Sequence, residues 1–507
     1  MDNQTLNNKR IAKNTAFLYL RMILVLLVSL YTTRIVLSEL GVVDYGIYNV
    51  VASFVSMFAF LNTSMSNGIQ RFYNFTLGSK ERTNISQVYS TAIQIQFFLA
   101  IILFVLLETV GLWYMYNEMV IPVERFTTAL YVFQFSVISM LFVVMQIPFS
   151  AAIMAYERMD YFAYVSLFDV SAKLVIAYIL VAINGDRLFW YGMMQLMVTI
   201  ICFSLYYCYV KHQFRILKFI PKIHKSLFKP MLSFSGWNLF GSFAYMIKSQ
   251  GLNMLLNVFF GPIVNAARGI SNMVMGAIQG FQGNIVLAFR PQIVQSYASG
   301  EYSRVKSLFY SLSKMSFILL SIFSLPVMLE LEYVLHLWLG TNIPDYTYSF
   351  TILVLLNMIV SSLNTPVTQV VHATGNMRKY QIVTGSLVCA ILPISWAFLK
   401  FGYNPNSVYV VSLIMTVINQ FACNWVLRTI FPYSLIEYFK KVFIPCLLFL
   451  FLTPIIPYLV HDNMDESCGR FILVTFLSVI LSVFFSYMIL LNKSERDILR
   501  KLIKITK

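Results

Sequence analysis

The segment from Phe97 to Leu107 reads FFLAIILFVLL and contains no polar side chain. It lies inside a longer apolar stretch, 88–110. A helix of about 20 residues crosses the hydrocarbon core of a bilayer, and this stretch is long enough to do so. Because lipid offers the backbone no hydrogen-bond partner, a spanning segment of this kind must satisfy its own backbone groups as a helix. The stretch therefore predicts a transmembrane helix.

Apolar stretches of similar length recur along the whole chain, and together they predict about 14 transmembrane helices. The fold class expected is an all-α integral membrane protein. The predicted helices are 14–37, 45–66, 88–110, 127–149, 161–183, 188–210, 231–258, 263–289, 308–329, 346–371, 380–399, 407–428, 441–460 and 471–491, with a turn at Gly261 and Pro262 between the seventh and the eighth.

The composition excludes a soluble protein. Of the 507 residues, 59% are hydrophobic and 11% are charged, and the mean hydropathy is +0.72; soluble proteins carry roughly 25% charged residues. The net charge of +16 is spread between apolar stretches rather than gathered on one folded face, so we expect no nucleic-acid partner. The six cysteines are scattered without ligand-like spacing, so we expect neither a metal nor a cofactor.

Basic residues are divided unequally between the two sides of the predicted helices. If the N-terminus is cytoplasmic, the outer loops hold only Arg125, Arg187, Lys400 and Arg470. Because cytoplasmic loops carry the excess of Lys and Arg, we predict that both termini are cytoplasmic.

An internal repeat divides the chain. Three residues recur at one common offset, without a gap: Pro148, Ala155 and Met159 return as Pro366, Ala373 and Met377. Transport folds built from repeats place the substrate between the halves. The predicted domains are two six-helix lobes, 1–210 and 231–430, a basic cytoplasmic linker, 211–230, and two extra helices with a basic cytoplasmic tail, 431–507.

These features resemble the multidrug, oligosaccharidyl-lipid and polysaccharide exporter superfamily, and within it the polysaccharide transporters of the Wzx type. The likeness rests on the 6+6+2 layout and on two motifs: Lys9, Arg10, Lys13, Asn14 and Thr15 at the entry to the first helix, and Leu40, Gly41, Asp44, Tyr45 and Gly46 after it. The resemblance implies a flippase in a bacterial cytoplasmic membrane. It would move an undecaprenyl-pyrophosphate-linked oligosaccharide to the outer leaflet by alternating access, for surface polysaccharide biosynthesis.

The resemblance also implies partners: the lipid-linked glycan, membrane lipids, and a polysaccharide polymerase with glycosyltransferases; the chain would act as a monomer. The drug-exporting branch of the superfamily uses acidic residues for cation coupling, and the first, seventh and eighth predicted helices hold no acid. A small-molecule or multidrug exporter and a flippase for the peptidoglycan precursor remain alternatives.

Charged residues inside a bilayer need a stated reason, because each costs about 2.5–3.5 kcal/mol on insertion scales. Within the predicted helices we single out one acid, Asp169, and six bases: Arg21, Arg34, Lys173, Lys248, Arg268 and Lys314. Such an excess suits a water-filled cavity that receives an anion such as pyrophosphate. We predict that Arg21, Lys173, Lys248 and Arg268 line this cavity.

The remaining charges admit other interpretations. Arg34 lies near the outer end of its helix, where its side chain can reach the headgroups. Asp169 and Lys173 are spaced four residues apart with the acid first, which favours a direct pair on one helix face. This pair is either a structural neutralisation or a site of ion coupling.

Polar residues form two stripes at helical spacing, one on each of two neighbouring helices. They suit sugar hydroxyls lining a cavity, and they also suit hydrogen bonds between helices. The stripe on 231–258 contains Asn238, Ser242, Tyr245, Ser249 and Asn253, and the stripe on 263–289 contains Arg268, Asn272, Met275, Gln279 and Gln282.

An enzyme is disfavoured, because the longest outer loop, from about Glu330 to Tyr346, has room only for a short turn or helix. The chain also has no G-x-x-x-x-G-K-[ST] phosphate-binding motif. A channel or receptor is disfavoured by the internal repeat.

Overall fold

The computed structural model describes residues 3–56, 59–79, 85–117, 119, 121–222, 224–339, 343–492 and 496. Within these residues the secondary structure is almost entirely helical and contains no β-strand. The prediction of an all-α membrane protein is confirmed. The chain divides into two compact units, Met1–Leu239 with Val294–Gly300, and Phe240–Ile293 with Glu301–Lys507.

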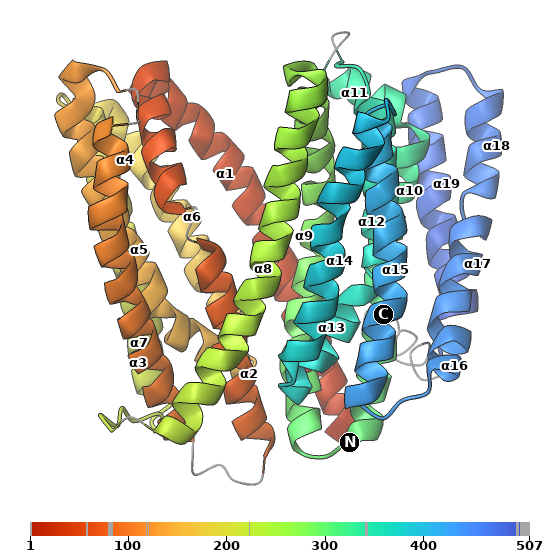
Figure 1. Cartoon of the computed structure of the whole chain (residues 1–507), viewed down its shortest axis with the longest axis horizontal. Coiled ribbons are helices and arrows are strands. Elements are labelled where there is room, and N and C mark those ends of the chain that lie inside the picture. The colour runs from red at the N-terminus through yellow and green to blue at the C-terminus, as the bar shows by residue number, and fades with distance from the viewer. Residues whose placement is uncertain are drawn as a thin grey trace, which may run out of the picture. The chain divides into compact units, whose positions relative to one another are not determined.

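The first unit is a helical bundle in which α1 packs against α6, and α5 packs against α7 and α2 (Figure 1). A five-residue π-helical segment, Leu107–Gly111, joins α3 to α4 without an intervening turn. The helices that begin in this unit are α1 (Asn3–Ser56), α2 (Ala59–Gly78), α3 (Ile85–Leu106), α4 (Leu112–Asn117), α5 (Phe126–Ala155), α6 (Met159–Ala182), α7 (Arg187–Gln213) and α8 (Lys225–Phe260).

The second unit contains most of α8 and α9 and all of the later helices. The C-terminal helices, darkest blue in Figure 1, lie beside α10, against which α19 packs. The remaining helices are α9 (Pro262–Ala298), α10 (Tyr302–Leu329), α11 (Leu331–Leu339), α12 (Thr347–Ser361), α13 (Asn364–Thr374), α14 (Met377–Lys400), α15 (Asn406–Ile430), α16 (Leu435–Tyr438), α17 (Ile444–Leu452), α18 (Ile455–Asn463) and α19 (Cys468–Phe485).

Ten helical stretches of the described chain are long and apolar enough to cross a membrane. The helices α1, α2, α8 and α9 are 54, 20, 36 and 37 residues long but are not among the ten. The polar stripes of α8 and α9 lower the mean hydropathy of these two helices. The count of fourteen helices and the side of the termini therefore stay predictions.

Gly41, which lies between the first two predicted helices, adopts φ 74° and separates two helical stretches within α1, as those predictions require. The structure corrects two details. The helix expected over 346–371 is interrupted by a turn at Ser362 and Leu363, next to Pro366, which has no N–H to donate to the Ser362 carbonyl; Thr347–Thr374 still counts as one candidate membrane span. Asp169 is also not the only acid in a spanning helix: Glu108 lies within Ile85–Asn117 and accepts a hydrogen bond from Gln134.

Other expectations of the sequence hold. Gly261 has φ 79°, and Pro262 opens α9 directly after it, as the turn prediction requires. In its described residues, the loop after Glu330, which is expected on the outer side, contains one short helix, α11.

Candidate functional site

The second unit encloses a cavity of about 560 Å³. Its walls come from six helices of this one unit: α8, α9, α12, α13, α14 and α15. The volume falls within the range of small-molecule sites, roughly 300–1,000 Å³.

Two basic residues reach this cavity, and their surroundings differ. Arg268 is buried, and its guanidinium donates from Nη2 to the Ser249 carbonyl oxygen at 2.9 Å and from Nη1 towards the Tyr409 hydroxyl at 3.4 Å. It therefore connects α9 to α8 and α15. Lys248 makes no hydrogen bond or ion pair with any described residue. Its ammonium is the cation of this cavity that can turn to a ligand.

The rest of the lining is rich in neutral polar groups. Amide side chains and hydroxyls alternate with apolar residues, and no Asp or Glu lies among the described lining residues. The polar groups are Tyr245, Ser249, Asn272, Gln279, Asn357, Ser361, Asn364, Thr365, Thr368, Gln369, Tyr380, Tyr409, Ser412, Thr416 and Asn419.

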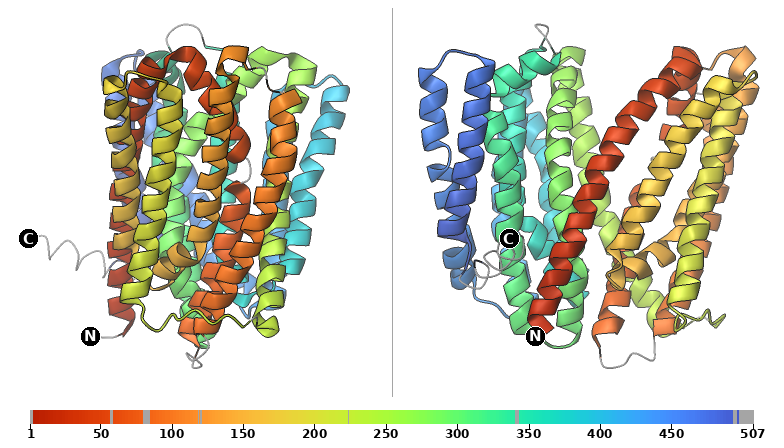
Figure 2. Two further views of the ribbon diagram at one scale, coloured as in Figure 1. Left: turned by 90° about the vertical axis from the view of Figure 1, so that its left-hand side faces the viewer. Right: turned by 180° about the vertical axis from the view of Figure 1, so that it is seen from behind.

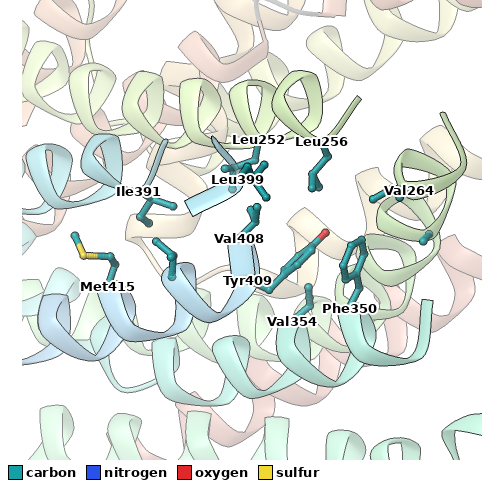
Figure 3. Packing of buried hydrophobic residues seen from close by; sticks show 12 residues of the cluster. Leu252, Leu256, Val264, Phe350, Val354, Ile391, Leu399, Val408, Tyr409 and Met415 are labelled. Atoms are coloured by element: carbon teal, nitrogen blue, oxygen red, sulfur yellow. The ribbon is translucent and has the colours of Figure 1, made fainter. Parts of the chain in front are cut away.

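A hydrophobic cluster fixes one side of the cavity. Its members come from α8, α9, α12, α14 and α15, and the Tyr409 ring lies 4.3 Å from the Phe350 ring, centroid to centroid (Figure 3). Leu252 and Leu256 of α8 belong to the same cluster. This packing holds the Tyr409 hydroxyl in place to accept from Arg268.

Residues on either side of the turn before Pro366 form another part of the cavity wall. Ser361 precedes this turn, and Asn364 and Thr365 follow it, and all three line the cavity. The Asn364 side chain is about nine-tenths buried, and its Oδ1 has no hydrogen-bond partner. An unsatisfied buried acceptor facing a cavity favours a ligand that carries hydroxyl or amide donors.

Some residues of the two predicted polar stripes line the cavity, and the others do not. Tyr245, Ser249, Asn272 and Gln279 line the cavity, as does Met275. The other members lie outside the lining. Gln282 is buried and donates to the Thr365 hydroxyl at 3.3 Å; Asn253 is exposed; Asn238 is buried in the first unit; Ser242 is partly buried.

Of the remaining charged residues, Lys314 is buried in α10 of the second unit, and the others belong to helices of the first unit. The Arg21 guanidinium lies 5.0 Å from the Phe162 ring, and its Nη1 lies 3.5 Å from the Ser166 hydroxyl oxygen. Lys173 donates to Asp169 at 2.8 Å, so the pair expected on one helix face is present. The side chain of Arg34 lies outside the described residues.

Several lining residues escaped the sequence prediction. On α15, Tyr409, Ser412, Thr416 and Asn419 follow each other at steps of three and four and form a polar stripe like those of α8 and α9. On α9, Arg290 lies beyond the predicted end of the helix and donates to Gln369, which lines the cavity, at 2.9 Å. The α15 stripe was visible in the sequence, but it carries no charge that marks it.

The fold and the cavity define a multi-pass helical membrane protein with a polar site inside one helical unit. Comparison with solved structures identifies the fold as that of MATE transporters of the MOP superfamily. A point mutant of a MATE transporter matches with a TM-score of 0.74 and 11% identity over 83% of this chain and 96% of that one. An outward-facing multidrug resistance MATE family transporter matches with 0.73 and 11% over 83% and 95%.

A MOP superfamily transporter from Pyrococcus furiosus, described as having a binding pocket of reversed polarity that suggests a different function, matches with a TM-score of 0.72. The identity is 12% over 83% of this chain and 95% of that one. No family model and no curated protein matches the sequence. At this identity the likeness shows the fold.

Proposed function

We propose that the chain is a transporter that moves an undecaprenyl-pyrophosphate-linked oligosaccharide from the inner to the outer leaflet of a bacterial cytoplasmic membrane. Alternating access would carry the head group, and Lys248 and Arg268 would bind its diphosphate, with Arg21 and Lys173 of the first unit as further contacts. The observation that carries the proposal is the charge of the cavity in the second unit: two bases and no acid among its described lining residues.

The neutral lining supports a glycan as the cargo. Sugar hydroxyls and acetamido groups both donate and accept hydrogen bonds, and amide side chains such as Asn272, Gln279 and Asn419 can match either role. A diphosphate next to Lys248 gains a charge-assisted hydrogen bond, which is stronger than a neutral one.

A second candidate function is the export of small molecules, because the fold is shared with multidrug resistance transporters. An organic cation would meet two like charges at Lys248 and Arg268, which disfavours it. An anionic small molecule, or the peptidoglycan precursor with its own pyrophosphate, would meet the same favourable charges.

The test is surface glycan in cells that carry Lys248→Glu, with Lys379→Glu as the matched control. Lys379 is an exposed base outside the cavity lining. We expect Lys248→Glu to abolish surface glycan at wild-type protein level, because a carboxylate repels the diphosphate, and the control to leave it unchanged. Normal surface glycan in cells with Lys248→Glu would contradict the proposal. So would a strain lacking this protein that keeps normal surface glycan but becomes sensitive to drugs.

A further inference from the structure

The segment between α7 and α8 carries exposed basic and apolar side chains that lie outside the cavity. We call residues 214–222 the strap; it is the yellow-green segment along the lower ends of the helices in the left view of Figure 2. It contains Arg215, Lys218 and Lys222 and no acidic residue. All three side chains are exposed, and none pairs with any residue in the described part of the chain.

Two side chains anchor the strap to the first unit. Phe214 and Leu217 are buried, and the Phe214 ring stacks on the Tyr156 ring with a centroid separation of 4.2 Å. The Leu217 amide donates to the Phe214 carbonyl at 2.8 Å, which makes a tight turn. The start of the strap is therefore fixed against α5 and α7.

A row of polar side chains on α3 holds the strap's backbone. Ser86, Ser90 and Gln94 recur every four residues and so share one face of the helix. Ser86 donates to the Ile216 carbonyl at 2.6 Å, and Gln94 donates to the Pro221 carbonyl at 3.0 Å.

Between these two contacts, Ser90 serves both as acceptor and as donor. Its hydroxyl oxygen accepts from the Ile220 amide at 2.7 Å, and the hydroxyl lies 3.3 Å from the Lys218 carbonyl. Side chains of α3 thus contact the strap's backbone at Ile216, Lys218, Ile220 and Pro221, and the exposed side chains of the strap project from this support.

Large apolar side chains stand between the basic ones on the outer surface of the strap. Ile216 is 56% exposed and Phe219 is 53% exposed. In water this exposure is unfavourable, but at the edge of a bilayer an aromatic or branched side chain can enter the region below the headgroups. Basic residues beside such anchors are the pattern that attracts anionic lipids.

We propose that the strap is a binding site for the headgroups of anionic phospholipids. Arg215, Lys218 and Lys222 contact the lipid phosphates, and Ile216 and Phe219 insert beside the acyl chains. Because α3 already holds the backbone, binding orders only side chains, which keeps its entropic cost low. This site lies on the side predicted to be cytoplasmic, and it is independent of the transported substrate.

The test is native mass spectrometry of the detergent-solubilised full chain, titrated with dioleoylphosphatidylglycerol and, separately, with dioleoylphosphatidylcholine. The variant combines Arg215→Ala, Lys218→Ala and Lys222→Ala. Each base near an anionic surface contributes about fivefold in affinity. We expect at least about a tenfold loss of phosphatidylglycerol affinity in the variant and no preference between the two lipids.

A control of equal charge removes three exposed bases of the second unit, Lys379→Ala, Arg428→Ala and Lys440→Ala, and should change the affinity less than about twofold. A further variant, Ile216→Ser with Phe219→Ser, keeps every charge and should still weaken phosphatidylglycerol binding. Equal losses in the strap variant and in the equal-charge control would overturn the proposal, as would displacement of the lipid by inorganic phosphate.

Discussion

Glu157 and Gly375 occupy equivalent left-handed turns in the two halves of the chain. Glu157 has φ 58° and lies in the connection from α5 to α6, and Gly375 has φ 80° and lies in the connection from α13 to α14. The two residues are separated by the same offset as Pro148 and Pro366. The repeated sequence therefore encodes a repeated backbone turn, and each half realises it with a different residue type.

This turn predicts a difference between glycine substitutions. Gly375→Ala should lower the free energy of unfolding by about 1–2 kcal/mol, because a Cβ at positive φ meets the carbonyl oxygen that follows it. Gly283→Ala is the control, since an added methyl group there meets no atom within 4 Å and Gly283 has an ordinary helical φ. Thermal unfolding in detergent measures both. Equal stability of the two variants would show that the turn is not strained.

The sequence predicted helices better than it predicted the cavity. Long apolar runs located the helices, and Gly261 fixed one turn, but some helix ends were misplaced: α8 begins at Lys225 instead of 231, and α9 ends at Ala298 instead of 289. Helical spacing placed Tyr245, Ser249, Asn272 and Gln279 on common faces, and all four line the cavity. Helical spacing gives the angular position of a residue around the helix axis but does not show whether the cavity extends to its level along that axis. The prediction therefore also included Asn253, which is exposed.

The wall around the turn before Pro366 depended on information that spacing does not contain. Ser361, Asn364 and Thr365 line the cavity on either side of this turn, where Pro366 has no N–H to continue the helical hydrogen bonds. A proline inside an apolar run can kink, break or leave a helix continuous; Pro148, its counterpart, lies inside the unbroken helix α5.

The two bases of the cavity should respond differently to removal. Arg268→Ala should lower both transport and stability, because the Ser249 carbonyl and the Tyr409 hydroxyl each lose a charged donor, worth about 1.5–3 kcal/mol for a hydrogen bond to a charged group. Lys248→Ala should lower transport without lowering stability, since no described residue depends on it.

Surface glycan and thermal unfolding, measured on the same preparations, separate the two effects. Arg268→Lys should restore part of the transport and little of the stability, because an ammonium cannot span both partners as a planar guanidinium does. An Arg268→Ala variant as stable as the wild type would contradict the conclusion that Arg268 stabilises the protein by connecting α9 to α8 and α15.

A buried ion cluster in the second unit provides a third prediction. Glu330 is almost fully buried and accepts from Arg470 Nη2 at 3.1 Å, and its other oxygen lies 2.9 Å from His461 Nδ1. Arg470→Met should destabilise the protein by about 3–5 kcal/mol, because it leaves a buried carboxylate with a single partner. Lys441→Met removes an exposed partner of Glu437 and should cost less than about 1 kcal/mol. Similar unfolding temperatures for both variants would contradict the assignment of a buried cluster.

Variants of Asp169 and Lys173 can distinguish a structural role of this ion pair from a role in ion coupling. Its Oδ2 and Nζ atoms lie 2.8 Å apart on α6, and the two side chains are 32% and 39% exposed. Asp169→Asn should lower the amount of protein in the membrane, because it leaves Lys173 without its counter-charge; the cost stays below the 2.5–3.5 kcal/mol of a fully inserted charge, since the ammonium is partly exposed. Asp169→Asn combined with Lys173→Gln removes both charges and should restore the protein level.

If the pair only neutralises charge, the double variant also keeps normal surface glycan, measured at equal protein level over a range of external pH. A double variant that is abundant but exports no glycan would instead assign Asp169 to coupling transport to an ion gradient.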